Sequence, residues 1–527
     1  MTSIENLQVI IVGSGPAGTS AAWPLVEAGV QVLMLDASDE SALPNSPSGS
    51  IATFRKDANR WRYQFGNDLS GVSLESDQSP KMTTPLARTI LARFATETDI
   101  LTNGFHAAGS LNAGGLSNIW GAVTALYDDQ DLLGYPFPGS ELSAYYQMVM
   151  NRIGVSGGQK IQAIAAKDRL TFSPPIRKII KRYRELENEP GFSMEVARNA
   201  VLQSIRGDRQ ECVQCGLCLW GCHRASIYNS AFEIPLLKKF SNFNYRAKSN
   251  VKRLFPRTAA HCLQVETEHG IELITAPIVI MAAGTIGTTA LVLDGLEQYR
   301  HPIKLLNNPV AAMAFIVPEL FMARMPEKSF SLGQLIYKLS SNKEECASGI
   351  LYAADALPLS LFAQRMPFSR PLALRLARAL APSLVLATCY LPGHYSNNNI
   401  QVHKCNGHAK VTIDGKLSIE AEGALLKAGS NLGKKLRRYG AFLLPGSLTI
   451  SPTGSDAHYA GTLPMGATTT LGCSNMGELN GCRGLFIADA SSLPKLPAKH
   501  CTLTVMANAS RIGDKLAHRL RKQCGSS

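Results

Sequence analysis

Four cysteines in the middle of the chain have the clearest spacing for chemistry. They lie in the stretch "ECVQCGLCLWGC" as a C-x2-C-x2-C-x3-C run, at Cys212, Cys215, Cys218 and Cys222. This spacing is typical of thiolates that wrap around an iron–sulfur cluster, although His223 stands where a proline usually follows. Gly216 and Gly221 leave room for the chain to fold tightly about such a cluster. We therefore predict an iron–sulfur cluster on this loop.

Other interpretations of the four cysteines stay open. Zinc is more often held by two CxxC pairs separated by a longer loop, and disulfides fit poorly in a reducing compartment. The cysteines could also be simple packing residues. In bacterial-type ferredoxins the fourth cysteine of such a run ligates a different cluster, and this chain has one run. A cluster here could be 4Fe-4S with four ligands or 3Fe-4S with three.

A glycine-rich turn near the N-terminus predicts a dinucleotide site. The segment "LQVIIVGSGPAGTSAAWPLVEAGVQVLMLDAS" contains an apolar strand, a turn with glycines at 13, 15 and 18, an amphipathic helix, and a second strand that ends at Asp36. In such a βαβ unit the glycines permit a tight turn, close approach of a pyrophosphate, and packing of helix on strand. The acidic residue holds ribose hydroxyls. FAD and NAD both remain possible on this segment alone.

Later segments of the chain resemble the flavin-binding segments of the glucose-methanol-choline (GMC) oxidoreductases in order and approximate spacing. They are "NAGGLSNIWGA" (112–122), "APIVIMAAGTIGTTALVLD" (276–294), "HYAGTLPMG" (458–466) and "GLFIADASSLPKLPAKHCTLTVMANASRIGDKL" (484–516). The resemblance covers most of the nucleotide-binding half and little of residues 125–210 and 305–450. It implies FAD as the cofactor. Some bacterial members of this family also carry a cysteine-bound cluster near the flavin.

The predicted flavin-binding residues lie in glycine turns and at the ends of strands. Glycines admit close approach of the backbone, while hydroxyl, amide and carboxylate groups supply hydrogen-bond partners. The predicted set is Gly13, Gly15, Gly18, Asp36, Gly114, Gly115, Ser117, Asn118, Val251, Ala283, Gly284, Asp489 and Ala490. The alternatives are an ordinary polar loop at 112–122 and a simple core strand before Gly284.

Two histidines are the predicted catalytic pair. His458 begins an H-x-x-G-T motif and His500 lies eleven residues after Asp489. The resemblance implies that both face the flavin N5. Hydride transfer from an alcohol requires removal of the hydroxyl proton, and imidazole, whose pKa is near neutrality, suits that task. We assign the principal base role to His500.

The elements around these residues predict an α/β fold, with a Rossmann-like FAD-binding domain interlaced with an α+β substrate domain. Short β-rich runs before His458 predict a mostly antiparallel sheet that roofs the flavin: "VAAMAFIVPEL", "SGILYAAD", "SLVLATCYLPG", "NNIQVHK" and "KLSIEAEG". We assign 1–124, 231–304 and 455–527 to the FAD-binding domain, 125–210 to a substrate or cap region, 211–230 to the cysteine loop, and 305–454 to the antiparallel sheet.

Charge and composition limit the class of partner and the compartment. Lys and Arg number 53 against 40 Asp and Glu, but no basic run is interleaved with aromatic residues, so nucleic acid is not an expected partner. The N-terminal apolar run is broken by glycines and proline, which indicates no secretory signal. With mostly scattered cysteines, the sequence predicts a cytoplasmic protein.

The segment "SRPLALRLARALAPS" predicts a helix that stands apart from the rest of the domain. Leu372, Leu376 and Leu380 fall on one side of it, opposite Arg375 and Arg378. Such a helix could lie on an anionic membrane. We favour a surface helix that packs by its leucine stripe over peripheral membrane contact.

Together these features predict a flavin dehydrogenase. It would oxidise a CH–OH group of a sugar, polyol or other alcohol by hydride transfer to flavin N5, and pass electrons through the cluster to an external one-electron acceptor protein. One alternative is an oxygen-using alcohol or sugar oxidase with structural cysteines. Another is a non-enzymatic flavin and cluster electron-transfer subunit, which would not need two histidines at the flavin face.

We predict that the FAD is bound without a covalent link. Family members with covalently attached flavin have the histidine of a Thr-His-Trp triplet as the attachment point, and the matching triplet here is Asn118, Ile119 and Trp120. Since Ile119 has no nucleophilic atom, acid precipitation of the holoprotein should release the flavin into the supernatant. Flavin absorbance that stayed with the precipitated polypeptide would contradict the prediction.

Overall fold

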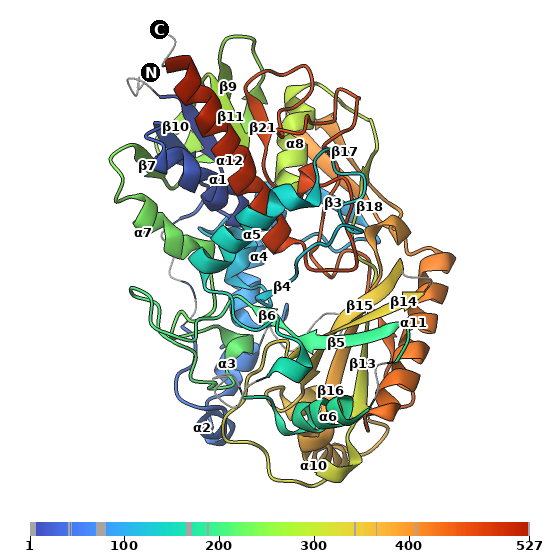
Figure 1. The fold of residues 1–527 in the computed structure, drawn as a ribbon. Helices are drawn as coiled ribbons and strands as arrows, with labels where there is room; N and C mark the ends of the chain where they lie inside the picture. Colours follow the sequence, from blue (N-terminus) through green and yellow to red (C-terminus); the bar gives the residue numbers. More distant parts are fainter. Residues whose placement is uncertain are drawn as a thin grey trace.

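The computed structural model shows two interlaced domains, each built on its own sheet (Figure 1). It describes residues 7–39, 43, 45–69, 81–164, 171–186, 189–341, 344–364, 366–405 and 408–524. Residues 1–6, 40–42, 44, 70–80 and 525–527 of the predicted FAD-binding segments lie outside these ranges. None of the helices in the described ranges is long and apolar enough to cross a membrane.

A five-stranded parallel sheet forms the centre of the first domain. Its order is β21 (Leu485–Ile487), β11 (Ile278–Met281), β1 (Val9–Val12), β2 (Val32–Leu35) and β7 (Phe243–Arg246). Every residue of the first four strands is buried, as expected for a parallel sheet covered on both faces. Strands from the beginning, middle and end of the chain therefore share one core.

Helices from both ends of the chain cover this sheet. α1 (Pro16–Glu27) lies beside α12 (Thr502–Cys524), as Figure 1 shows in blue and red. The two helices approach closely at Gly513, which has no Cβ. A Cβ at this position would lie 2.4 Å from the Ala21 carbonyl oxygen. α5 (Gly139–Ile153) packs on α12, and α8 (Thr285–Gly295) follows β11. Further helices are α4 (Pro85–Glu97) and the shorter α2 (Ile51–Lys56), α3 (Trp61–Phe65) and α7 (Ile234–Leu237).

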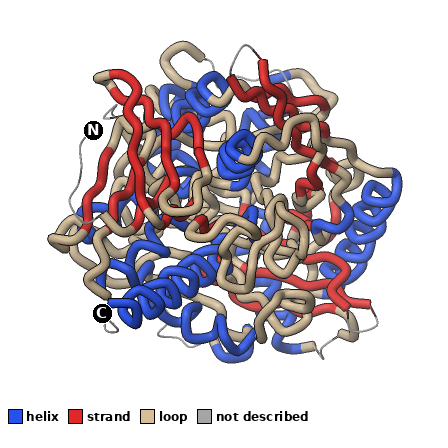
Figure 2. The backbone as a smooth tube through the Cα atoms, turned by 90° about the horizontal axis from the view of Figure 1, so that it is seen from above, coloured by secondary structure: helices blue, strands red, loops and turns tan. Residues whose placement is uncertain are grey.

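Two smaller sheets flank the parallel sheet. One is antiparallel and contains β8 (Asn250–Phe255), β9 (His261–Thr267) and β10 (Gly270–Ala276). The other contains β12 (Ile303–Leu305), β17 (Asn398–Cys405), β18 (His408–Asp414) and β3 (Ile100–Asn103). A short ribbon pairs β4 (Val123–Thr124) with β6 (Arg198–Asn199). Seen from above, the strands fall into separate groups with helices and loops between them (Figure 2).

An antiparallel sheet forms the second domain. Its order is β19 (Phe442–Leu443), β13 (Val310–Ile316), β16 (Leu384–Tyr390), β15 (Glu344–Ala353), β14 (Leu335–Ser341) and β5 (Phe192–Val196), and β20 (Thr449–Ile450) also pairs with β13. Alternate residues of β13 and β16 point to opposite faces. Ala311, Phe315 and Val385 join a core with α6 (Pro174–Glu185) and α11 (Ile419–Arg438).

The predicted architecture, a Rossmann-like domain interlaced with an antiparallel-sheet domain, is confirmed, with two corrections. "NNIQVHK" forms β17 of the separate four-stranded sheet. "KLSIEAEG" begins α11, because the Ser418 side chain caps the helix by accepting a hydrogen bond from the backbone N–H of Ala421. The region 125–210 is shared: α5 packs on α12, whereas α6 and β5 belong to the second domain.

Candidate active site

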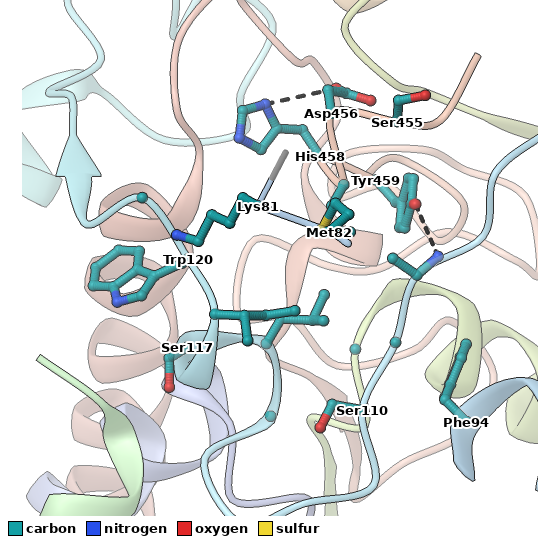
Figure 3. Close-up of a pocket in the computed structure, with 18 of the residues that line it drawn as sticks. Lys81, Met82, Phe94, Ser110, Ser117, Trp120, Ser455, Asp456, His458 and Tyr459 are labelled. Carbon is teal, nitrogen blue, oxygen red and sulfur yellow. Dashed lines mark hydrogen bonds and ion pairs between the residues drawn. The ribbon is translucent and has the colours of Figure 1, made fainter. Parts of the chain in front are cut away.

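One cavity of about 2280 Å³ lies between the two domains. It extends from the glycine turn after β1, past the two predicted histidines, to the helices α9 (Leu359–Ala363) and α10 (Arg370–Leu380). Figure 3 shows side chains from several segments around it, among them Ser117, Trp120 and His458. The cavity therefore brings the predicted cofactor and catalytic residues to one place.

The glycine turn has the shape that a dinucleotide pyrophosphate requires. Gly13 has φ = 100°, and a Cβ there would lie 2.5 Å from the Ala282 carbonyl oxygen. A Cβ at Gly18 would lie 1.9 Å from the Gly13 carbonyl oxygen, so helix α1 can pack on the turn only with glycine here. Gly15, at the N-cap of α1, has nothing within 4 Å of its Cβ position and faces the cavity. The open helix N-terminus fits a phosphate group.

Asp36, at the end of β2, holds this turn and lines the cavity. Its Oδ2 accepts a hydrogen bond from the Ser14 backbone N–H at 2.7 Å, and its Oδ1 accepts one from the Ser38 N–H at 2.9 Å. The side chain is buried and lines the cavity. Asp36 therefore has the position predicted for a ribose ligand while also fixing the loop that would receive the phosphates.

The loop at 112–122 is braced from within by two of the predicted cofactor residues, Ser117 and Asn118. Ser117 Oγ accepts a hydrogen bond from the Ser230 N–H at 3.0 Å and donates to the Gly114 carbonyl oxygen. Asn118 Nδ2 donates to the carbonyl oxygens of Ala113 and Gly115. Their polar atoms shape the loop instead of pointing freely to a ligand.

Two glycines keep this loop against the first turn. Gly114 has φ = 84° and its N–H donates to Ser14 Oγ at 3.0 Å. A Cβ at Gly115 would lie 3.5 Å from the Gly15 Cα, so the two glycine loops lie against each other. Ile119, the residue on which the non-covalent prediction rests, is buried and lines the cavity.

The remaining predicted cofactor residues also line the cavity. They are Val251 on β8, Ala283 and Gly284 after β11, and Asp489 and Ala490 after β21. Asp489 is buried, and its carboxylate accepts hydrogen bonds from Thr288 Oγ1 and from the Ser491 N–H. Burial raises the pKa of Asp489. The carboxylate links the two turns that follow neighbouring parallel strands.

The structure brings the two predicted catalytic histidines side by side. The ring centroids of His458 and His500 are 5.1 Å apart, with the ring planes at 78°. The Tyr390 ring contacts both, at 5.7 Å and 5.3 Å. His458 follows β20 and His500 precedes α12, so each ring comes from a different part of the chain.

A buried asparagine, Asn308, sets the protonation of His458. Its Nδ2 donates to the carbonyl oxygens of Leu391 and Pro497, each at 2.8 Å. Its Oδ1 must therefore be the atom that faces His458 Nδ1, at 3.2 Å. An amide oxygen can only accept, so His458 Nδ1 carries the proton and Nε2 is left as an acceptor. Sequence reasoning missed Asn308, since a single asparagine before a predicted strand carries no signal.

The neighbouring Asp456 does not charge His458. Its Oδ2 lies 3.6 Å from His458 Nδ1, a distance that alone would suggest an ion pair (Figure 3). However, burial raises the pKa of Asp456 to about 7 and lowers the pKa of His458 to about 4. We favour the neutral pair because removing two charges from water costs more than their attraction returns. Burial and the neighbouring His458 lower the pKa of His500 as well, so both imidazoles are neutral at pH 7.

An ion-pair network fixes the segment that carries His500. Lys499 is 5% exposed, and its Nζ contacts Asp128 Oδ2 at 2.9 Å and Asp131 Oδ2. The pKa of Asp128 falls to about 2, since the bond to Lys499 and its positive charge outweigh the opposing effect of burial. Burial dominates at Asp131 and raises its pKa. This network connects the His500 segment to the region after β4. No pattern in the sequence predicted it.

The four cysteines gather beside the cavity as free thiols. Cys218 lines the cavity, and Cys212 Sγ accepts a hydrogen bond from the Gln214 N–H at 3.4 Å. Burial raises the pKa of Cys212 to about 11, while its bond from Gln214 acts in the opposite direction. Within the described residues, no set of three or more His, Cys, Asp and Glu side chains is arranged to hold a metal ion. The iron–sulfur cluster stays a prediction.

Lys81 is a further cavity residue that the sequence did not indicate. Its side chain reaches toward the centre of the site between Trp120 and Met82 (Figure 3). Loss of solvation lowers its pKa to about 8, partly offset by the nearby Cys218. The amine therefore lies where the cysteine loop meets the cavity.

Known proteins match this chain in two segments and in its fold. Residues 438–509, which include both histidines, match the GMC oxidoreductase family, and residues 6–51 match the FAD binding domain family. Over 133 residues the chain is 30% identical to L-amino acid oxidase Lm29 of Lachesis muta, a match that spans 25% of this chain and 22% of that protein. The crystal structure of pyridoxine 4-oxidase from Mesorbium loti has a similar fold, with a TM-score of 0.63 and 16% identity over 97% of this chain and 99% of that chain.

These matches confirm the predicted FAD-binding domain and the GMC character of the C-terminal segment. Together with the fold, they support the prediction of an FAD-dependent oxidoreductase. The two matched segments do not include the four cysteines at 212–222.

We expect Asp456 to make stability depend on pH. Its pKa is about 7 in the folded protein and about 4 in an unfolded chain. Between these values only the folded state keeps the proton, so the free energy of unfolding falls as pH rises from about 4 to about 7, by at most about 4 kcal/mol. Asp456→Asn removes this effect. The melting temperature of the variant, relative to wild type, should therefore increase between pH 5 and pH 8.

Thermal unfolding of the holoproteins, followed by circular dichroism at both pH values, measures this difference. Any cost of placing the new Nδ2 opposite Asn307 is independent of pH and cancels. Asp208→Asn, at an exposed position, is the matched control and should keep a constant offset. A constant offset for Asp456→Asn as well would show that the buried carboxyl does not titrate in this range.

Proposed function

We propose that this protein oxidises the CH–OH group of an alcohol, with FAD as the hydride acceptor and the His458–His500 pair as the proton acceptor. The observation that carries the proposal is the pair itself: two neutral, half-buried imidazoles meet in the cavity that the glycine turn and Asp36 also line. A proton acceptor beside a flavin site is what hydride abstraction from an alcohol requires.

The residues of this chain fit FAD along the length of the cavity. The N-terminus of α1 at Gly15 and the turn at Gly284 have open space for phosphates, and Asp36 is placed for ribose hydroxyls. When bound, FAD would take the two-electron hydride that leaves the alcohol carbon. The surrounding protein would hold the cofactor and exclude water.

The two histidines receive the hydroxyl proton of the substrate. Asn308 leaves His458 Nε2 as an acceptor, and His500 is neutral beside it, so either ring can accept a hydrogen bond from the alcohol. We keep His500 as the principal base, and His458 then orients the hydroxyl group. A positioned base contributes about 3 to 5 kcal/mol to lowering the barrier.

His458→Ala and His500→Ala should each keep FAD but slow flavin reduction by substrate at least about a hundredfold, the low end for loss of a general base. The measurement is anaerobic stopped-flow bleaching of the flavin with a panel of sugars, polyols and aliphatic alcohols. His394→Ala, at an exposed position outside the cavity, is the matched control. Near-normal reduction in both variants would favour a non-enzymatic flavin carrier.

We also propose that the cysteine loop holds an iron–sulfur cluster. Four free thiols at ferredoxin-like spacing support this, together with the position of Cys218 at the cavity wall. Burial raises the pKa of Cys215 and Cys218, and hydrogen bonds from the backbone N–H groups of Leu217 and Ser331 act in the opposite direction. A cluster would supply one-electron transfer to an acceptor protein.

Cys215→Ser and Cys218→Ser should lose iron and acid-labile sulfide, and keep FAD. Flavin reduction by substrate should stay near the parent rate, while reduction of an artificial one-electron acceptor slows, and rapid-mixing spectra separate the two steps. Cys346→Ser, at an exposed site away from the loop, is the control. A parent protein without iron, or one that turns over fastest with oxygen alone, would instead indicate an oxidase with structural cysteines.

A further inference from the structure

The far end of the cavity is apolar, which bears on the class of alcohol it accepts. Beyond the histidines it is lined by large aliphatic and aromatic side chains, including Leu384, Leu386, Leu361, Phe362, Met366 and Leu444. Two hydroxyl groups of this end are already bonded to the protein, and the polar side chains that line the cavity near α9 and α10 are those of Gln364 and Arg370. Ser447 Oγ donates to the Leu444 carbonyl oxygen at 2.7 Å, and Thr388 Oγ1 accepts from the Ile350 N–H at 3.3 Å. A sugar would find few partners for its hydroxyls in this wall.

Helices α9 and α10 form the outer end of this apolar wall. Leu361 and Phe362 of α9 and Leu380 of α10 line the cavity. The two helices pack on each other through a small cluster of alanines, Ala363, Ala373 and Ala377. The cavity therefore extends from the histidines as far as this helix pair, and α10 lies at the bottom of Figure 1.

Helix α10 exposes apolar side chains, one of them from the predicted leucine stripe. Of that stripe, Leu376 and Leu380 are half-buried and Leu372 is 44% exposed, while the fully buried positions are Ala373 and Ala377. Leu374, outside the stripe, is 43% exposed. A hydrogen bond from the Met322 N–H to the Ala379 carbonyl oxygen places a second exposed pair beside the helix. In that pair Phe321 is 46% and Met322 is 73% exposed.

The same helix is strongly basic. Arg375 and Arg378 are exposed, and α10 contains no acidic residue. The neighbouring acid Glu319 is already paired with Lys178 and Arg182 of α6. Exposed leucine, phenylalanine and methionine beside free guanidinium groups is the composition of a helix that lies in the interface of an anionic bilayer. Charge complementarity therefore favours an anionic lipid surface as the occupant of this face.

We infer that α10 and the Phe321–Met322 turn rest on an anionic lipid surface, and that the substrate is an apolar alcohol that enters the cavity from that surface. The inference rests on the proposed function for its chemical step. In that step the alcohol gives its hydroxyl proton to an imidazole and its carbon-bound hydride to FAD, and it leaves as the carbonyl compound. An apolar product would return to the bilayer by the same route.

Vesicle co-sedimentation tests the surface independently of any reaction. The holoprotein should bind vesicles of phosphatidylcholine with about one third phosphatidylglycerol at least about tenfold more tightly than pure phosphatidylcholine vesicles, and high salt should weaken the binding. Leu372→Ser/Met322→Ser and Arg375→Glu/Arg378→Glu should each abolish it. The matched control is Leu426→Ser/Lys427→Glu, two exposed positions on α11, which should bind as wild type. Flavin content and circular dichroism verify that each variant is folded.

Flavin bleaching tests the substrate class. 1-Decanol should reduce the flavin at least about tenfold faster than glucose under anaerobic conditions, since burying its chain removes apolar surface from water. With decanol carried in anionic vesicles, the α10 variants should slow at least about tenfold, while soluble 1-butanol should reduce them like wild type.

Each failure of these tests has a separate meaning. If no alcohol reduces the flavin, the proposed function fails, and vesicle binding still reports on the helix. Absence of vesicle binding, or a dimer in solution that Leu372→Ser/Met322→Ser dissociates, would overturn the lipid surface as the occupant. Faster bleaching by glucose than by decanol would overturn the apolar substrate.

Discussion

The catalytic geometry depends on the hydrogen bonds of one buried amide, Asn308. A buried asparagine side chain must satisfy two donors and an acceptor, and here each bond reaches a different segment: Leu391, Pro497 and His458. The backbone N–H of Asn308 also donates a hydrogen bond to Asp456 Oδ2. These segments come from the antiparallel sheet and from the C-terminal part of the FAD-binding domain. Because leaving any of these groups unpaired is costly, Asn308 favours the arrangement in which these segments meet beside the two histidines.

Electrostatics in the site follow from the same burial. Asp456 and His458 lie close enough to form an ion pair, but burial shifts the pKa of each side chain toward its neutral form. At His500, burial and the neighbouring His458 ring both lower the pKa. The site therefore has proton acceptors without fixed charge at its centre, and the charges are held outside, at Lys499 with its two aspartates. This separation leaves both histidines neutral, with a ring nitrogen free of its proton, and leaves the cavity compatible with an apolar substrate.

The sequence predicted what depends on local pattern and failed where distant contacts decide. The turn at Gly13, Gly15 and Gly18 could be found because its backbone geometry demands glycine at fixed spacing. "KLSIEAEG" looked like a strand by composition, but the Ser418 cap and the apolar face of α11 made it helical. Asn308 and Lys499 were missed because their partners lie far away in the chain. The sequence predicted helix α10 correctly. Its fully buried residues are small alanines, which allow closer packing than leucine.

The sharing of one sheet by both ends of the chain has a consequence for biosynthesis. β21 completes the parallel sheet beside β11, and α12 packs against α1, so the sheet that contains β1 is complete and α1 gains this neighbour only after about 490 further residues have been synthesised. His500 lies just before α12. Contacts of such long sequence separation form slowly and only after the whole chain has emerged. Cofactor loading should therefore be a post-translational event, and a chain released early, even by a few dozen residues, would expose apolar strand edges to chaperones and proteases.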